Sequence, residues 1–214
     1  MRIFLCNLIA IKERNGETID FAILNETMPE LGANNLLVSW NHGSTMPRVI
    51  KTHKRYVPLF GKTRSLGIIR DPRDVMVSYY HYCRDRKRVF SGTFGEFIRT
   101  ADRGIPAWFK HYNSWRDRWT MVVKYETMKR EPRAMFEDIL GFLNVSVTSS
   151  QLEAAILRSD TNRVIAMDKK VQQRGESAQF VRSSKINQWT SYFDDEDRIL
   201  FERAAEAYEF DLYE

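Results

Sequence analysis

Three short apolar segments constrain the fold most strongly, because each ends in polar residues and precedes a helical or turn-rich stretch. They are RVIKTH (48–53), SLGIIR (65–70) and TMVVKY (120–125). Runs of this kind are typical of strands buried on both faces, and their alternation with helices predicts a parallel α/β sheet. Ligands gather at the carboxyl ends of such strands, so we expect the polar residues there to share one edge. These residues are Lys51, His53, Arg70 and Tyr125.

A helix start follows the second of these strands. Asp71 is a suitable N-cap, Pro72 suits the first helical position, and Asp74 is expected to complete the capping arrangement. The pattern predicts a helix that begins near Pro72. A cation, a helix N-terminus and the hydroxyl of Ser78 would then lie close together, which favours an anion site.

Further helices are predicted from capping residues and from apolar periodicity. Apolar residues recur at helical spacing through 135–143, and Thr148 with Gln151 forms a capping pattern before LEAAIL. Asp194 is expected to cap a last amphipathic helix, on which Ile199, Leu200, Ala204 and Tyr208 point one way. The segment 168–184 has no clear period and is interpreted as a mobile loop.

The N-terminal run MRIFLCNLIAI is interpreted as a buried helix, since charged residues follow it without a small-residue cleavage site. No stretch reaches the roughly 20 apolar residues of a membrane span. Cys6 and Cys83 are the only cysteines, which fits a reducing compartment and a cytoplasmic protein.

Composition predicts one globular domain over residues 1–214. The 214 residues are 43% apolar, enough for one substantial core. The formal charge of +5 and the pI near 9.2 suit a nucleic acid, an anionic lipid surface or a small polyanionic ligand. Charge alone does not choose among these partners, and the sequence leaves the oligomeric state open.

Four motifs in register resemble the sulfotransferases that use 3′-phosphoadenosine 5′-phosphosulfate (PAPS). IKTH (50–53) is similar to the family's Lys-Thr-His element, and IIRDPRDVMVSYYHY (68–82) to its 3′-phosphate strand-helix unit. VVKYETMKREP (122–132) is similar to its Tyr-Glu-x-Met segment. RSSKINQWTSYF (182–193) keeps the Arg, Trp and Phe spacing of the family's RKGxxGDWKNxF loop, although Ser183, Ser184, Asn187 and Gln188 replace its Lys, Gly, Gly and Asp.

The resemblance implies a three-layer, P-loop NTPase-like α/β fold, with a central parallel sheet flanked by helices. It implies transfer of a sulfuryl group from PAPS to a hydroxyl or amine acceptor, with 3′-phosphoadenosine 5′-phosphate (PAP) as product. The acceptor would be a small molecule, a glycan or a lipid. No metal is expected, because the strand ends lack paired carboxylates near the basic cluster.

Roles for individual residues follow from the same resemblance. Arg70 and Ser78 would hold the 3′-phosphate, and a guanidinium fork with a nearby hydroxyl is chemically suited to it. Tyr125 would pack on the adenine and Thr161 would hydrogen-bond to it. Arg182, Ser183 and Ser184 would add contacts from the loop, whereas Trp189 would either anchor that loop or touch the ligand. The structural alternative is that Arg70 only forms an ion pair with Asp71 or Asp74.

His53 is the expected general base, since a neutral imidazole near pH 7 can accept the acceptor's proton. Lys51, two residues earlier on the same strand face, would stabilise charge on the transferring oxygens. The other histidines, His42, His81 and His111, are interpreted as structural or solvated. A strand-end histidine bonded to backbone and a solvated lysine are the structural alternatives for His53 and Lys51.

One expected element is absent from the sequence. The family's glycine-containing 5′-phosphosulfate loop has no counterpart here, and residues 1–21 are similar to the helix that follows that loop. We therefore expect the chain to begin inside the domain, without its first strand. The alternative function is an inactive PAP- or PAPS-binding or interaction module.

Two other classes of protein, P-loop kinases and nucleic-acid-binding proteins, fit the sequence less well. A P-loop kinase needs the G-x-x-x-x-G-K-[ST] motif, and that motif is absent from the sequence. Nucleic-acid binding is suggested only by the pI and by basic-aromatic runs such as YYHYCRDRKR (79–88). We expect no nucleic-acid partner.

Overall fold

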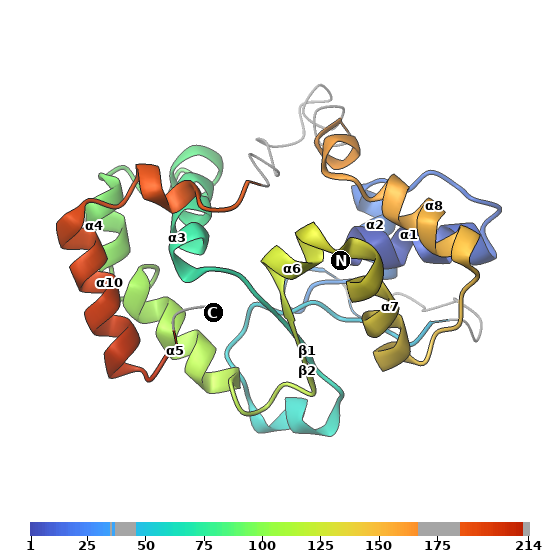
Figure 1. The fold of residues 1–214 in the computed structure, drawn as a ribbon, viewed down its shortest axis with the longest axis horizontal. Coiled ribbons are helices and arrows are strands. Elements are labelled where there is room, and N and C mark those ends of the chain that lie inside the picture. Colours follow the sequence, from blue (N-terminus) through green and yellow to red (C-terminus); the bar gives the residue numbers. More distant parts are fainter. Residues whose placement is uncertain (35, 37–45, 167–184, 212–214) are drawn as a thin grey trace. The chain divides into compact units, whose positions relative to one another are not determined.

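A computed structural model describes residues 1–34, 36, 46–166 and 185–211. The chain divides into two compact units (Figure 1), and each is described by itself. The first unit comprises Met1–Lys54 and Thr127–Met167, and the second comprises Arg55–Glu126 and Asp168–Glu214. The single domain expected over 1–214 stays a prediction. The loop predicted over 168–184 lies outside the described residues.

The first unit is built on a buried N-terminal helix, α1 (Arg2–Glu13), as the sequence predicts. Phe4 is fully buried, and its ring stacks on that of Phe136 with centroids 3.7 Å apart. Asn7, buried in the same helix, donates to the hydroxyl of Ser159 at 3.1 Å. The other helices of this unit are α2 (Phe21–Thr27), α7 (Pro132–Leu143) and α8 (Ser149–Arg158), with α8 packed on α1.

Capping residues explain where these helices begin and end. The side chain of Asp20 accepts from the backbone N–H of Ile23 and starts α2. Thr148 and Gln151 form the predicted capping box at the start of α8. Asn144 closes α7 in a left-handed conformation, with φ 57°.

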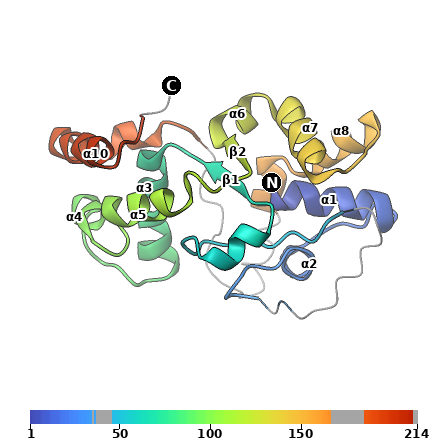
Figure 2. The same cartoon turned by 90° about the horizontal axis from the view of Figure 1, so that it is seen from below.

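The second unit contains the sheet and the helices that follow its strands (Figure 2). Its elements are η1 (Pro58–Lys62), β1 (Leu66–Ile69), α3 (Pro72–His81), η2 (Tyr82–Arg86), α4 (Phe94–Arg99), α5 (Ile105–Trp115), β2 (Met121–Lys124), η3 (Gln188–Ser191) and α10 (Asp195–Ala207). Helix α6 (Tyr125–Arg130) follows β2 directly and crosses the boundary between the units.

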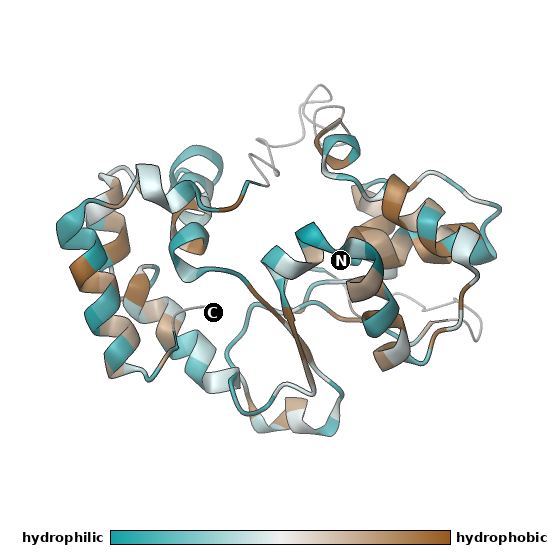
Figure 3. Ribbon diagram, in the orientation of Figure 1, coloured by the Kyte–Doolittle hydropathy of each residue, from teal (hydrophilic) through white to brown (hydrophobic). Residues whose placement is uncertain are grey.

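Two of the three predicted strands form a parallel pair of apolar strands (Figure 3). The register runs from Leu66 opposite Met121 to Ile69 opposite Lys124. Gly67 leaves room for the indole of Trp119, because a Cβ atom at this position would lie 2.6 Å from the ring.

The strand predicted over 48–53 was wrong. Only Lys51 pairs there, in an isolated parallel bridge with Glu30. The backbone N–H of Lys51 donates to Pro29 O at 2.9 Å, and that of Leu31 donates to Lys51 O at 2.8 Å. Pro29 has no N–H to continue the ladder, and the Thr52 hydroxyl accepts the N–H of Lys54 and turns the chain.

An aromatic core holds the helices of the second unit together. Phe201 of α10 is buried, with its ring centroid 5.7 Å from that of Phe109 and 6.3 Å from that of Phe193. Asp194 caps α10 as predicted, and Leu200, Ala204 and Tyr208 of the predicted face pack against this core. The prediction was wrong for Ile199 and missed the most buried residues of the helix. Phe201 and Ala205 lie inside, whereas Ile199 is 48% exposed, because the facing aromatic rings select the phase of the helix.

Candidate cofactor and catalytic sites

Arg70 and Ser78 meet where β1 ends and α3 begins. Arg70 directly follows β1, and the Asp71 side chain caps α3 by accepting from the N–H of Arg73 at 2.9 Å. Ser78 lies two turns into α3, and Nη1 of Arg70 donates to its hydroxyl at 3.2 Å. The structure therefore brings together the two residues predicted to hold the 3′-phosphate.

The Arg70 guanidinium is held on several sides and is only 15% exposed. Its Nη2 donates to Asp74 Oδ2 at 3.0 Å and to the Lys185 carbonyl at 2.7 Å. The guanidinium carbon lies 4.8 Å from the ring centroid of Tyr125. Its buried Nε has no hydrogen-bond partner within the described part of the chain. A rigid cation with an unmet donor is suited to receive an anion.

Tyr125 follows β2, next to Arg70, which agrees with the shared edge expected for these two residues. Burial raises the pKa of the Tyr125 phenol, and the nearby Arg70 cation opposes that rise. The phenol therefore stays neutral near pH 7 and offers a flat, uncharged ring.

The role expected of Asp74 in capping was wrong. Its buried carboxylate accepts from the backbone N–H groups of Asn187 at 2.9 Å and Trp189 at 3.0 Å, besides Arg70. An aspartate in the first turn of a helix usually reads as a capping residue, so no local signal in the sequence indicated these distant partners.

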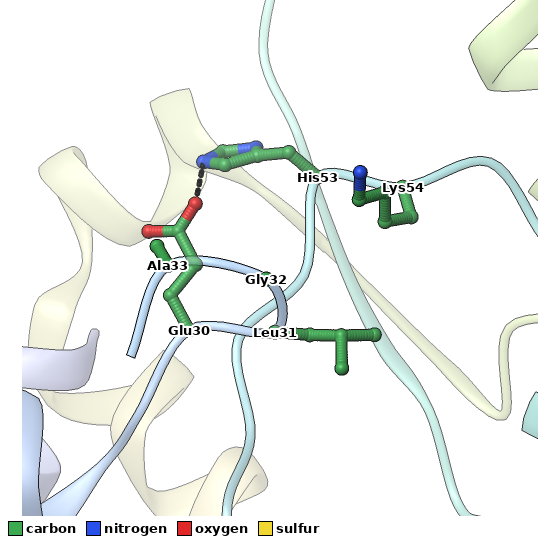
Figure 4. Close-up of a pocket in the computed structure, with 6 residues that line it drawn as sticks. All are labelled: Glu30, Leu31, Gly32, Ala33, His53 and Lys54. Atoms are coloured by element: carbon green, nitrogen blue, oxygen red, sulfur yellow. Dashed lines mark ion pairs between the residues drawn. The ribbon is translucent and has the colours of Figure 1, made fainter. Parts of the chain in front are cut away.

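Lys51 and His53 both face the carboxylate of Glu30, a residue that no sequence pattern indicated. Lys51 Nζ lies 2.8 Å from Glu30 Oε2, and His53 Nε2 lies 3.9 Å from Glu30 Oε1. Figure 4 shows the imidazole reaching toward this carboxylate. Glu30, His53 and Lys54 help to line an open pocket of about 260 Å³, with residues 31–33.

The charges of Glu30, Lys51 and His53 act on one another. Desolvation lowers the pKa of His53 and the Lys51 cation lowers it further, whereas Glu30 opposes both effects. Burial raises the pKa of Glu30, but the hydrogen bond and charge of Lys51 outweigh it and leave that pKa below its ordinary value. At neutral pH the arrangement keeps Glu30 ionised and His53 neutral. The His53 side chain is 73% exposed, so desolvation of its ring is only partial and the ring can exchange its proton with solvent.

The remaining predicted site residues divide between described and undescribed parts of the chain. Thr161 lies at the start of a helical stretch, 161–166, and its hydroxyl accepts from Lys129 Nζ at 2.9 Å. Arg182, Ser183 and Ser184 lie outside the described residues. The Trp189 ring packs against Arg73, whose guanidinium carbon lies 3.8 Å from the ring centroid. The Trp189 side chain therefore anchors the segment 185–189.

Among the other histidines, His81 has the contacts of a structural residue. Its Nδ1 lies 2.8 Å from Asp85 Oδ2, and its Nε2 lies 2.8 Å from the Tyr192 hydroxyl. Both ring nitrogens are therefore engaged, which agrees with its interpretation as structural. His42 lies outside the described residues.

Comparison with known proteins decides the family. The family model described as "Sulfotransferase domain" matches residues 15–209. The chain belongs to the sulfotransferase family. Among curated members, Sulfotransferase 4A1 of Mus musculus is 36% identical over 125 residues, covering 52% of this chain and 44% of the relative. Sulfotransferase 1C2 of Rattus norvegicus is 27% identical over 169 residues, covering 69% and 56%.

Solved sulfotransferase-like structures confirm the predicted α/β fold class. Retinol dehydratase, solved in a complex with retinol and PAP, matches with a TM-score of 0.71 and 17% identity, covering 98% of this chain and 78% of that chain. Mouse sulfotransferase SULT7A1, solved with PAP, matches with a TM-score of 0.63 and 22% identity, covering 77% and 66%. This sulfotransferase-family chain spans about half the length of the curated relatives it matches.

Two kinds of structural feature are absent from the described residues. No helix there has the length and apolarity to cross a lipid bilayer. Nor do the described residues contain a group of three histidine, cysteine or acidic side chains arranged to hold a metal ion. The metal independence expected of this family member stays a prediction.

Proposed function

We propose that this chain binds PAPS and transfers its sulfuryl group to a hydroxyl or amine. One observation carries the proposal: Arg70 donates to Ser78 while its buried Nε remains without a partner among the described residues. An arginine just before a helix N-terminus, with a serine hydroxyl further along that helix, suits a phosphate, and the 3′-phosphate distinguishes PAPS from ordinary adenine nucleotides.

Tyr125 and Thr161 are each suited to contact an adenine. The Tyr125 ring is neutral and lies beside Arg70, so it can pack on a base attached to the bound phosphate. The Thr161 hydroxyl already accepts from Lys129, which leaves its own hydrogen free to be donated. Solved relatives bound to PAP support a ligand of this class.

His53 would take the proton that sulfuryl transfer releases. The acceptor oxygen or nitrogen attacks sulfur, the bond from sulfur to the phosphate oxygen breaks, and PAP departs as an anion. The acceptor's proton passes to the neutral imidazole of His53, and Lys51 stabilises charge on the transferring oxygens. Glu30 holds Lys51 and favours the imidazolium that forms.

The acceptor we propose is a small molecule. Retinol dehydratase has been solved with androsterone and with retinol, which are small apolar alcohols. Their presence in structural relatives supports a hydroxyl acceptor of that size for this chain.

Calorimetric titration with PAP and with adenosine 5′-monophosphate (AMP) tests the proposal. PAP should bind at least tenfold more tightly, a difference of about 1.4 kcal/mol, because only PAP carries the 3′-phosphate. Equal affinities would overturn the assignment. PAP binding without turnover of PAPS on any acceptor would support the inactive binding module instead.

A further inference from the structure

We propose that Asp74 is a positioning residue that couples the phosphate-binding Arg70 to the segment 185–189. One buried carboxylate would then hold two parts of the site that are more than one hundred residues apart in sequence. The inference rests on the proposed function, because it assigns Arg70 to a ligand. All the residues that carry it belong to the second unit.

Asp74 is the least exposed charged residue near the site. Its side chain is 0% exposed, and burying a carboxylate is strongly unfavourable unless it is paired. Three donors meet this requirement: Arg70 Nη2 at 3.0 Å and the N–H groups of Asn187 and Trp189 at 2.9 and 3.0 Å. Hydrogen bonds to a charged acceptor are the stronger kind, so the arrangement fixes all three partners.

The two carboxylate oxygens of Asp74 link Arg70 to the segment 185–189, because one of them accepts from both. Oδ2 accepts from both Arg70 and Asn187, whereas Oδ1 accepts from Trp189. A shift of the segment would move the oxygen that orients the guanidinium. Arg70 also donates to the Lys185 carbonyl at 2.7 Å, so it contacts the segment 185–189 directly as well as through Asp74.

Arg73 reinforces this arrangement from the same helical turn. Its guanidinium carbon lies 3.8 Å from the Trp189 ring centroid, within the range of a cation–π contact. Asp71 holds it with two hydrogen bonds, from Nε at 3.0 Å and Nη2 at 2.7 Å. The first turn of α3 therefore holds Trp189 by its backbone and by its ring.

The consequence for ligand binding is preorganisation. Asp74 and Lys185 occupy Nη2 of Arg70. Nη1, shared with Ser78, and Nε, which has no partner among the described residues, therefore remain for a phosphate. A guanidinium already fixed in its binding orientation loses less entropy when the ligand arrives. By linkage, a 3′-phosphate that stabilises Arg70 must also stabilise the segment 185–189.

Asp74→Asn tests the coupling, with Asp197→Asn as the matched control. An amide in place of the carboxylate removes the charge and turns an NH2 toward one of its donors. Asp197 is also a buried aspartate, paired with Arg99, so its variant likewise removes the charge of a buried, paired carboxylate. We expect D74N to weaken PAP binding at least tenfold, leave AMP binding unchanged and so abolish the preference for PAP. D197N should keep that preference.

A D74N variant that folds and keeps the wild-type preference for PAP would overturn the inference and leave the proposed function standing. A wild-type chain without that preference would remove the proposed function and, with it, this inference. If D74N does not fold, hydrogen exchange in the wild-type chain decides. PAP, but not AMP, should slow exchange of the backbone amides in peptide 185–193, and an unchanged rate would overturn the coupling.

Discussion

Nη1 of Arg70 lies 3.2 Å from the Ser78 hydroxyl, and this contact joins the end of β1 to the second turn of α3. The two residues are eight positions apart in sequence, and the Asp71 cap with Pro72 sets the start of the helix between them. A strand that ends in a cation therefore delivers it to a hydroxyl on the next helix.

Arg70→Ala should remove most of the preference for PAP over AMP. The substitution deletes the charge and the donors assigned to the 3′-phosphate, while AMP does not use them. Ser78→Ala should reduce the preference less, by roughly 0.5–1.5 kcal/mol, as expected for one hydrogen bond. Calorimetry of both variants with both nucleotides measures this, and an unchanged preference in R70A would place the phosphate elsewhere.

Substitutions of Lys51 and Glu30 should move the pKa of His53 in opposite directions. Lys51 lowers this pKa, so Lys51→Ala should raise it. Glu30 raises it, so Glu30→Gln should lower it. The neutral base is present above the pKa, so the acidic limb of any activity profile should move to higher pH in K51A and to lower pH in E30Q. NMR titration of the His53 ring measures both pKa shifts, with His111 as reference. Shifts of the same sign would contradict the arrangement of Glu30, Lys51 and His53.

His53→Ala should slow sulfuryl transfer by roughly 10²- to 10⁴-fold and leave PAP affinity nearly unchanged, because a general base acts chiefly in the transition state. His111→Ala, on α5, is the control histidine and should keep its turnover. Single-turnover kinetics with PAPS and an active acceptor measure the step. Unchanged turnover in H53A would move the base to another residue without affecting the family assignment.

Gly67→Ala should destabilise the chain by about 1–3 kcal/mol, because the added methyl would clash with the indole ring of Trp119. Gly141→Ala is a matched change inside α7, where an added Cβ meets nothing within 4 Å. It should stabilise the chain by about 0.5–1 kcal/mol through helix propensity. Urea unfolding of both variants measures the difference, and an equal effect of the two would contradict the packing at Gly67.

Chelation should leave PAP binding unchanged. Lys51 and the arginines can supply the positive charge that a metal would otherwise provide. Titration with PAP in the presence and absence of a chelator measures this directly. A strict magnesium requirement would favour kinase-like chemistry over sulfuryl transfer.

Short-range sequence patterns predicted several elements of the fold and of the site. The Asp71–Pro72 start of α3, the Thr148–Gln151 box and two of three strands all follow from short-range patterns. The partners of Asp74 do not, because Asn187 and Trp189 lie 113 and 115 positions away and pack by tertiary contact. Glu30 was missed for the same reason: only the isolated bridge at Lys51 brings it beside His53.

The predicted strand over 48–53 failed, and the predicted face of α10 wrongly included Ile199, for physical reasons that a sequence pattern does not contain. A strand needs a partner with free N–H groups, and Pro29 removes one beside Lys51. The phase of α10 is selected by the rings of Phe109 and Phe193, which favour Phe201 over Ile199 as the buried residue.

Titration of the wild-type chain with PAP and with adenosine 2′,5′-bisphosphate tests the central claim most directly. The two nucleotides have the same charge and composition and differ only in which ribose hydroxyl carries the second phosphate. A site built from Arg70 and Ser78 for the 3′-phosphate should bind PAP at least tenfold more tightly. Equal affinities would mean that the basic surface attracts any bisphosphate, and would contradict the account.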